Sequence, residues 1–257
     1  MLPIGTCRLC QTENISLCAS HIIPEFFYNR VYTKFHKFAA IAKDGDERLV
    51  VEQKGYRENL LCQTCETKLS RWERKLSQLS NEIVCDSYAT CTASKVLNVD
   101  ILTGVDYCGI KMAIISIFWR MSVANHSLFA DYDLGPYANE FRRLLDQEQL
   151  PSGSEFPVLI SKGLLDGNFL AGVLFPVGRG RYRNDLIIQS VVLNGIVFDC
   201  IMTKTRKIPD EIIEFSLQPN GRVLVPSREY DNLGLSLNDF STRMKKNDVK
   251  GFFKRHA

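Results

Sequence analysis

Residues Asn59-Leu60-Leu61-Cys62-Gln63-Thr64-Cys65-Glu66 contain one of two Cys-x-x-Cys pairs, and the other pair is Cys7-Arg8-Leu9-Cys10. The spacing of each pair lets both thiolates converge on one ion, and two pairs complete the tetrahedron that zinc prefers. A redox pair would instead begin a helix within a βαβ unit, and no such unit precedes Cys7. The two pairs therefore predict one structural zinc ion, with no coordination position left open for catalysis.

The 51 residues between the two pairs must loop out from the zinc site. They include the segment Ala19-Ser20-His21-Ile22-Ile23-Pro24-Glu25. Two short β-like runs, residues 38–42 and 48–52, flank the turn-forming residues 43–46 and predict a hairpin.

A family resemblance rests on the order of these motifs: Cys-x-x-Cys, then His21 ahead of Pro24, then Asn-Leu-x-Cys-x-x-Cys. This order is similar to that of the zinc-bearing HNH endonucleases, and the match covers residues 7–75. The segment Ile115-Ser116-Ile117-Phe118-Trp119-Arg120 also resembles the bacterial proteins that carry an SHIIP-type HNH module. The resemblance implies an N-terminal ββα-metal module, a β-hairpin followed by a helix.

The same resemblance implies roles for four residues. His21 would be the general base that activates water, because a neutral imidazole accepts a proton near pH 7. Asn59 would brace the loop through its amide, and Glu66 would hold a catalytic magnesium or manganese ion. Ser20 stands where the family usually places the second metal ligand, an Asp or His, and a neutral hydroxyl is a poor ligand for magnesium. Glu66 restores the negative charge that Ser20 lacks.

Glu73 lies two helical turns beyond Glu66, about 10 Å along the axis, and we expect it to be a surface charge rather than a second ligand.

Helical periodicity predicts three helices. Apolar residues recur at three- and four-residue steps over residues 66–84. Residues 109–124 are apolar on most sides, so this helix should be buried, with Phe118 and Trp119 in the core. A third helix spans residues 136–145.

The last hundred residues contain β-branched runs separated by Gly, Asn and Pro turns, with the hairpin dipeptide Asn194-Gly195 between two of them. This pattern predicts an antiparallel sheet. We therefore expect an α+β protein with a nuclease-like zinc domain (residues 1–98), a helical region (99–150) and an antiparallel β-sheet domain with a basic tail (151–257).

Basic residues near the zinc pairs are candidates for phosphate contacts, which a nuclease needs. They are Arg57, Lys68, Arg71 and Lys75, with Arg74 beside them. Two further basic clusters are residues 179–183 and 243–257. These clusters predict binding to nucleic acid, mainly DNA, without strong sequence preference.

Composition sets broad limits. The chain has 257 residues, 45% hydrophobic and 24% charged, with a formal net charge of +3, as is ordinary for a soluble globular protein. No apolar run approaches the ~20 residues of a membrane span, and the first ten residues resemble no secretory signal. The odd number of nine cysteines argues against a secreted disulfide scaffold, so we expect a cytoplasmic protein.

Two functional interpretations follow. The first is a divalent-metal-dependent HNH-like endonuclease, in which the C-terminal domain binds a partner or regulator, for instance in antiphage defence. The second is a non-catalytic zinc module that binds nucleic acid or protein, and Ser20 is the feature that favours it.

Overall fold

A computed structural model describes residues 2–41, 49–130, 132–165, 167–169, 171–172, 174–175, 179–182, 186–203 and 207–229. The strands are β1 (Ile4–Gly5), β2 (Ile15–His21), β3 (Lys37–Ile41), β4 (Leu49–Gln53), β5 (Arg57–Cys62), β6 (Thr92–Val96), β7 (Val99–Thr103), β8 (Val158–Leu165), β9 (Asn168–Phe169), β10 (Leu174–Phe175), β11 (Arg179–Tyr182), β12 (Leu186–Leu193), β13 (Ile196–Ile201) and β14 (Val223–Glu229). The α-helices are α1 (Gln63–Cys85), α2 (Tyr107–Val123), α3 (Tyr137–Asp146) and α4 (Asp210–Phe215), and the 3-10 helices are η1 (Glu25–Arg30) and η2 (Ser127–Phe129).

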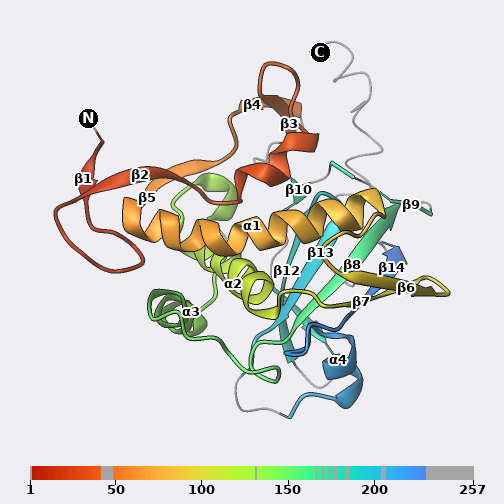
Figure 1. Cartoon of the computed structure of the whole chain (residues 1–257). Helices are drawn as coiled ribbons and strands as arrows, with labels where there is room; N and C mark the ends of the chain where they lie inside the picture. The colour runs from red at the N-terminus through yellow and green to blue at the C-terminus, as the bar shows by residue number, and fades with distance from the viewer. Residues whose placement is uncertain are drawn as a thin grey trace.

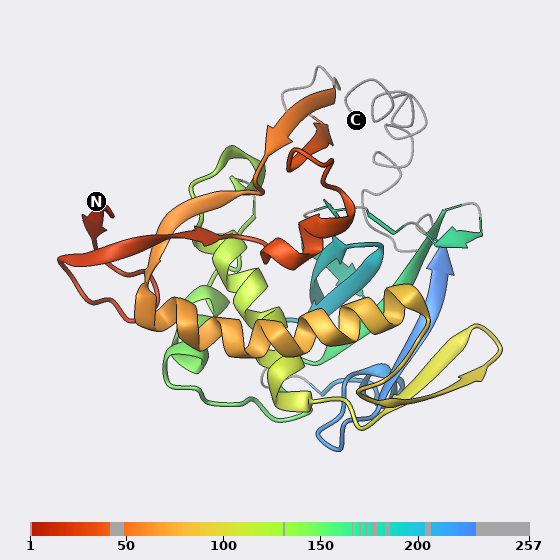
Figure 2. The same ribbon diagram turned by 45° about the horizontal axis from the view of Figure 1, so that its top comes forward.

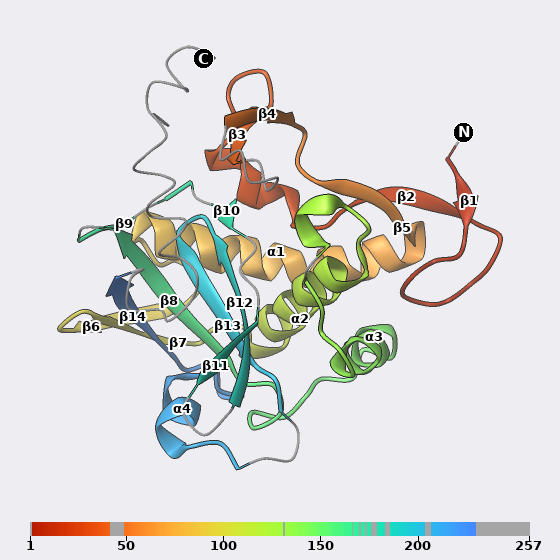
Figure 3. The same ribbon diagram turned by 180° about the vertical axis from the view of Figure 1, so that it is seen from behind.

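The chain is a mixed α+β protein built around one long helix. Figure 1 shows α1 reaching from the β2–β5 strand pair at one end to the large sheet at the other. Helix α2 crosses α1 steeply, and both helices lie on one face of the large sheet, whose other face is seen in Figure 3. The crossing is clearest in Figure 2. Their apolar side chains form one continuous core with the sheet.

The three predicted helices are confirmed, and local chemistry explains where α1 ends and where α2 begins. Helix α1 buries its apolar stripe and ends at Asp86, which adopts a left-handed conformation (φ 50°). Helix α2 is apolar on nearly all sides and buried from end to end, and the Asp106 side chain caps it by accepting a 2.9 Å hydrogen bond from the Gly109 amide. Phe118 and Trp119 are core residues, as predicted.

Three sheets are present in the described part. A small sheet has the order β1-β2-β5, and the large sheet has the order β10-β12-β13-β8-β14-β7-β6, with β11 on β12 and β9 on β8. Strands β3 and β4 pair antiparallel, as the predicted hairpin requires, while its turn at residues 42–48 lies outside the described residues. The predicted Asn194-Gly195 turn joins β12 to β13, with both residues at positive φ (55° and 79°) as a two-residue hairpin of type I′ requires.

The large sheet differs from the antiparallel sheet that we expected. Strand β14 pairs in parallel with β8 through Ser227↔Lys162 and antiparallel with β7 through Val223↔Leu102, so the sheet is mixed. The expected boundary at residue 98 falls inside the β6–β7 hairpin, where Val96 pairs with Val99. Alternation of apolar residues specifies strands but not their partners, which explains the difference.

Among the described residues, no helix combines the length and the hydropathy that crossing a lipid bilayer requires.

Candidate functional site

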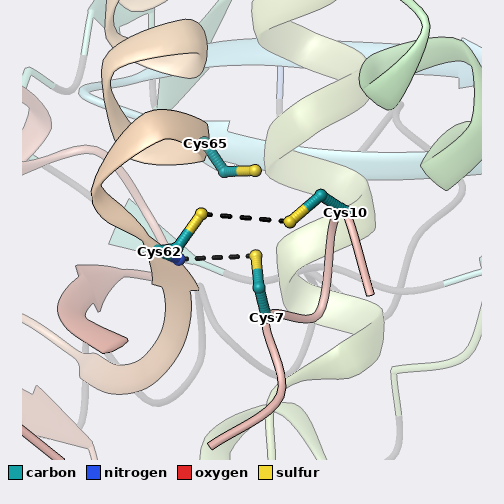
Figure 4. Close-up of side chains that lie close together, drawn as sticks. All are labelled: Cys7, Cys10, Cys62 and Cys65. Carbon is teal, nitrogen blue, oxygen red and sulfur yellow. Dashed lines mark hydrogen bonds between the residues drawn. The ribbon is translucent and has the colours of Figure 1, made fainter. Parts of the chain in front are cut away.

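Four cysteine thiols converge where β5 meets α1. Cys62 caps the N-terminus of α1, Cys65 lies in its first turn, and Cys7 and Cys10 approach from the turn after β1 (Figure 4). All four sulfurs lie within 4.8 Å of one another, and the Cys10 and Cys62 sulfurs are 3.9 Å apart. Zinc–sulfur bonds of ~2.3 Å in a tetrahedron place sulfurs about 3.8 Å apart, so the cluster fits one zinc ion.

The electrostatics of the cluster favour thiolate at one position. A hydrogen bond from Cys65, aided by backbone amides, lowers the pKa of Cys7 to about 4, although burial opposes the shift. The same contact raises the pKa of Cys65, because its proton is held between the two sulfurs. A thiolate is the metal-binding form of cysteine, so the cluster has one ligand already ionised at neutral pH.

His21 ends strand β2 and lies opposite Arg57 in the last pair of the β2–β5 ladder. The Arg57 Nε donates a 2.8 Å hydrogen bond to Nε2 of His21, and an Arg57 terminal nitrogen lies 3.2 Å from Glu25. The Glu25 carboxylate is also 3.5 Å from His21 Nε2. The His21 side chain keeps 18% of its surface exposed, so a ligand can reach this trio from solvent.

The surroundings of His21 favour its neutral form. Burial lowers its pKa below 6.5, the Arg57 guanidinium lowers it further, and the Glu25 carboxylate opposes the change. Arg120 and Glu73 act more weakly, in opposite directions. The imidazole is therefore largely unprotonated at pH 7, which is the state a general base requires.

Glu66 lies in the first turn of α1, next to the buried Ser20. Burial raises the pKa of Glu66, while the Ser20 hydroxyl and Arg120 oppose the change. Among the described residues, Glu66 Oε1 is shielded from solvent and has no hydrogen-bond partner. The Ser20 hydroxyl accepts a 3.2 Å hydrogen bond from the Leu61 amide and donates one of 3.4 Å to the Cys18 carbonyl, so it is already engaged.

Two charged residues at this site were not predicted. Arg120 of α2 donates a 2.7 Å hydrogen bond to the His21 carbonyl and forms an ion pair with Glu73 of α1. Our expectation that Glu73 is a surface charge was wrong, because its side chain is only 20% exposed and is held by this pair. A sequence signal existed: an arginine in a helix apolar on every side must be buried and needs a partner.

The predicted phosphate contacts do not gather in one place. The predicted basic residues of α1 lie along one edge of the helix: Lys68, Arg71 and Lys75. The two acidic residues, Glu66 and Glu73, lie on the opposite edge, because each is two positions before a lysine and a step of two positions is about 200° of helix rotation. The basic edge is also paired: Arg71 with Glu148 at 2.8 Å, Lys68 with the Asp146 carbonyl at 2.5 Å, and Lys75 with Asp106 at 3.7 Å. Of the four predicted contacts, only Arg57 lies beside His21.

Asn59 shares a strand face with Arg57, because alternate residues of β5 point the same way. Its side chain is exposed and makes no hydrogen bond within the described part of the chain, so the loop-bracing role implied by the resemblance stays a prediction. The basic tail, residues 243–257, and Arg183 lie outside the described residues.

No protein-family model matches this chain, and neither curated proteins nor solved structures show a significant similarity to it. A functional assignment must therefore come from the residues and geometry of the chain itself.

Proposed function

We propose that this chain is a zinc-stabilised HNH-like endonuclease that hydrolyses phosphodiester bonds in nucleic acid, mainly DNA. One observation carries the proposal: His21 ends the first of two antiparallel strands, the second of these strands leads directly into a helix, and the cysteine cluster lies at that junction. This succession of two strands and a helix supports the ββα-metal module that the sequence resemblance implies, and it sets the expected base beside an arginine.

In this mechanism His21 removes a proton from the attacking water. Its lowered pKa keeps the acceptor nitrogen available at neutral pH. Arg57 is the nearest cation to that nitrogen, and a substrate phosphate offers the guanidinium a stronger, doubly hydrogen-bonded partner than imidazole does. Binding of the phosphate would draw Arg57 toward it and release Nε2 to accept the proton. Glu25 keeps the arginine near the site in the meantime.

Glu66 and Ser20 are the residues that would hold a magnesium or manganese ion, once the shielded Glu66 oxygen is opened to solvent. Glu66 offers a buried carboxylate oxygen without a partner among the described residues, and the Ser20 hydroxyl lies beside it. Magnesium commonly keeps several waters and takes one or two carboxylates plus a substrate phosphate, so a single carboxylate is a sufficient protein contribution. When bound, such an ion offsets the negative charge that develops on the phosphate.

Plasmid cleavage in magnesium or manganese tests the proposal. The His21→Asn variant should lose at least 100-fold in rate, the range that a positioned base contributes. His36→Asn is the matched control, because the His36 ring packs against Tyr32 and not against His21, and its positive φ of 53° suits asparagine. Cleavage by both variants at the wild-type rate would refute the assignment of the base.

The rival function is a non-catalytic zinc module that binds nucleic acid or protein. Two observations favour it: the Ser20 hydroxyl already has hydrogen-bond partners, and the hydrogen bond from Arg57 occupies His21 Nε2. Titration of labelled DNA separates the two functions. Tight binding that does not depend on magnesium, without cleavage in any divalent metal, would support the module.

A further inference from the structure

Helix α2 carries a fully buried arginine among apolar side chains near its C-terminal end. Arg120 is 1% exposed, among isoleucine, phenylalanine and methionine neighbours of the same helix. Burial of a charge is unfavourable unless partners replace the water that it loses. The contacts of Arg120 therefore show what this buried charge holds in place.

Its guanidinium joins three elements of the fold. One terminal nitrogen donates to the main-chain carbonyl of His21 at the end of β2, and the other pairs with Glu73 on α1. The Nε atom donates to the Ser116 carbonyl one turn earlier in α2, at 3.4 Å. Since guanidinium is planar and its donors are fixed in direction, these contacts define one orientation of the group.

The carbonyl that Arg120 binds belongs to the proposed base itself. The β2–β5 ladder ends at the pair His21↔Arg57, and the chain then turns into Ile22 and Ile23. The amide of this same peptide, Ile22 N–H, donates a 3.0 Å hydrogen bond to the Tyr56 carbonyl, but its carbonyl oxygen has no strand partner among the described residues and faces Arg120 instead. The hydrogen bond from Arg120 ties the carbonyl side of this peptide to α2, so the peptide plane, which helps to set the direction in which the imidazole leaves the backbone, is held from both sides.

We propose that Arg120 is a positioning residue for His21: it anchors the main chain of the base to α1 and α2 and so holds the imidazole toward the substrate. The inference rests on the proposed function, because it takes His21 as the base. It adds that the site depends on a residue from outside the β2–β5–α1 unit, and that Glu73 acts by orienting Arg120.

A matched control exists on the same helix. Lys111 is also 1% exposed and charged, but it donates to the carbonyls of Ser152 and Glu155 and to the Tyr107 hydroxyl, away from His21. Lys111→Met therefore removes an equally buried cation of α2 without touching the site. A purely structural role of Arg120 predicts that the two substitutions behave alike.

The experiment compares Arg120→Met, Arg120→Lys, Glu73→Gln and Lys111→Met in the full chain. It measures kcat and KM for DNA cleavage and, independently of activity, the ¹⁵N NMR signals of the His21 ring. We expect Arg120→Met to lower kcat at least tenfold with KM changed less than twofold, and to shift or broaden the His21 signals. Arg120→Lys should restore part of kcat, Glu73→Gln should lower it, and Lys111→Met should change neither kcat nor the signals.

The outcomes separate the two proposals. A folded Arg120→Met variant with wild-type kcat and unchanged His21 signals would overturn the positioning role. Equal losses of kcat in Arg120→Met and Lys111→Met would also overturn it, since the loss would then be one of general stability. If Arg120→Met does not fold, the folded Glu73→Gln variant decides by the same two readouts. If the wild-type chain cleaves nothing, the proposed function fails, while the His21 signals still report whether Arg120 holds the ring.

Discussion

Arg57 donates a 2.8 Å hydrogen bond to the imidazole nitrogen of His21, its direct partner across the β2–β5 ladder. The proposed base and the cation proposed to bind phosphate are thus in contact in the structure without a substrate. In the proposed mechanism a substrate phosphate would compete with the imidazole for this guanidinium, so binding of phosphate and release of the base would be one event.

Substitution Arg57→Ala should raise the pKa of His21. The Arg57 guanidinium disfavours the protonated form of His21, whereas the Glu25 carboxylate favours it. When Arg57 is removed, the effect of Glu25 is no longer opposed by the guanidinium beside the ring, so the pKa rises. An NMR titration of the His21 ring measures the change. Arg71→Ala is the matched control, because Arg71 of α1 forms a similar exposed ion pair with Glu148, away from His21. An equal effect of both substitutions would show that the contact seen in the structure is not kept in solution.

The four-cysteine cluster should hold one zinc ion per chain, and Cys62→Ser should abolish binding and destabilise the fold strongly. Structural zinc contributes ~10–16 kcal/mol in zinc-finger peptides, so loss of one ligand is severe. Atomic emission gives the zinc content, and thermal unfolding gives the stability. Cys108→Ser should change neither, because Cys108 is exposed and outside the cluster. Full zinc content in Cys62→Ser would exclude this site.

Lys111 should make the stability of the chain depend on pH in the alkaline range. Burial lowers its pKa to about 8 from 10.5. Between these values the unfolded chain binds more protons than the folded one, so the stability contributed by Lys111 rises with pH. The shift corresponds to on the order of 3 kcal/mol. The free energy of unfolding of the wild type, measured in urea, should therefore rise by this amount relative to that of Lys111→Met between pH 7.5 and 10.5. A difference between the two proteins that stays constant with pH would contradict the burial of the ammonium group.

Two glycines at positive φ should respond differently to alanine. A Cβ at Gly221 (φ 78°) would lie 2.6 Å from the Val105 carbonyl oxygen, whereas a Cβ at Gly104 (φ 83°) meets no atom within 4 Å. Gly104→Ala should cost about 1–2 kcal/mol for the left-handed backbone alone. Gly221→Ala should lower the free energy of unfolding by at least ~2 kcal/mol more, because the new Cβ meets a main-chain atom, which cannot move aside by changing a side-chain rotamer. Denaturant unfolding of both variants tests this, and equal costs would mean that the turn at Gly221 is not packed against Val105.

Local features of the fold followed from the sequence. Apolar periodicity located α1, α2 and α3, the Asn194-Gly195 dipeptide located one hairpin, and cysteine spacing brought together a cluster whose pairs lie far apart in the chain. Each of these signals is contained in a short window of residues, and the residue types leave few other structures open.

The features that the sequence did not reveal depend on distant partners. Nothing within residues 99–103 or 223–229 indicates that these strands pair, or that β14 lies parallel to β8. Arg120 stands out by its apolar context, yet its partners Glu73 and His21 come from other elements. The basic residues of α1 lie close together in sequence and suggested a phosphate-binding face: Lys68, Arg71 and Lys75. In the structure they form ion pairs with acidic residues near the end of α3 and at the start of α2, which the sequence alone does not place beside them.

The position of β14 between β7 and β8 has a consequence for synthesis of the chain. Strand β7 ends about 120 residues before β14 begins. At ~5–20 residues per second, β7 leaves the ribosome roughly 6–24 s before its partner exists. During that interval the β6–β7 hairpin lacks the strand that connects it to β8 and the rest of the large sheet. Among the described strands, β14 is the last of the large sheet to be translated and connects β7 to β8, so a nascent chain that stalls before residue 223 exposes an unpaired strand edge.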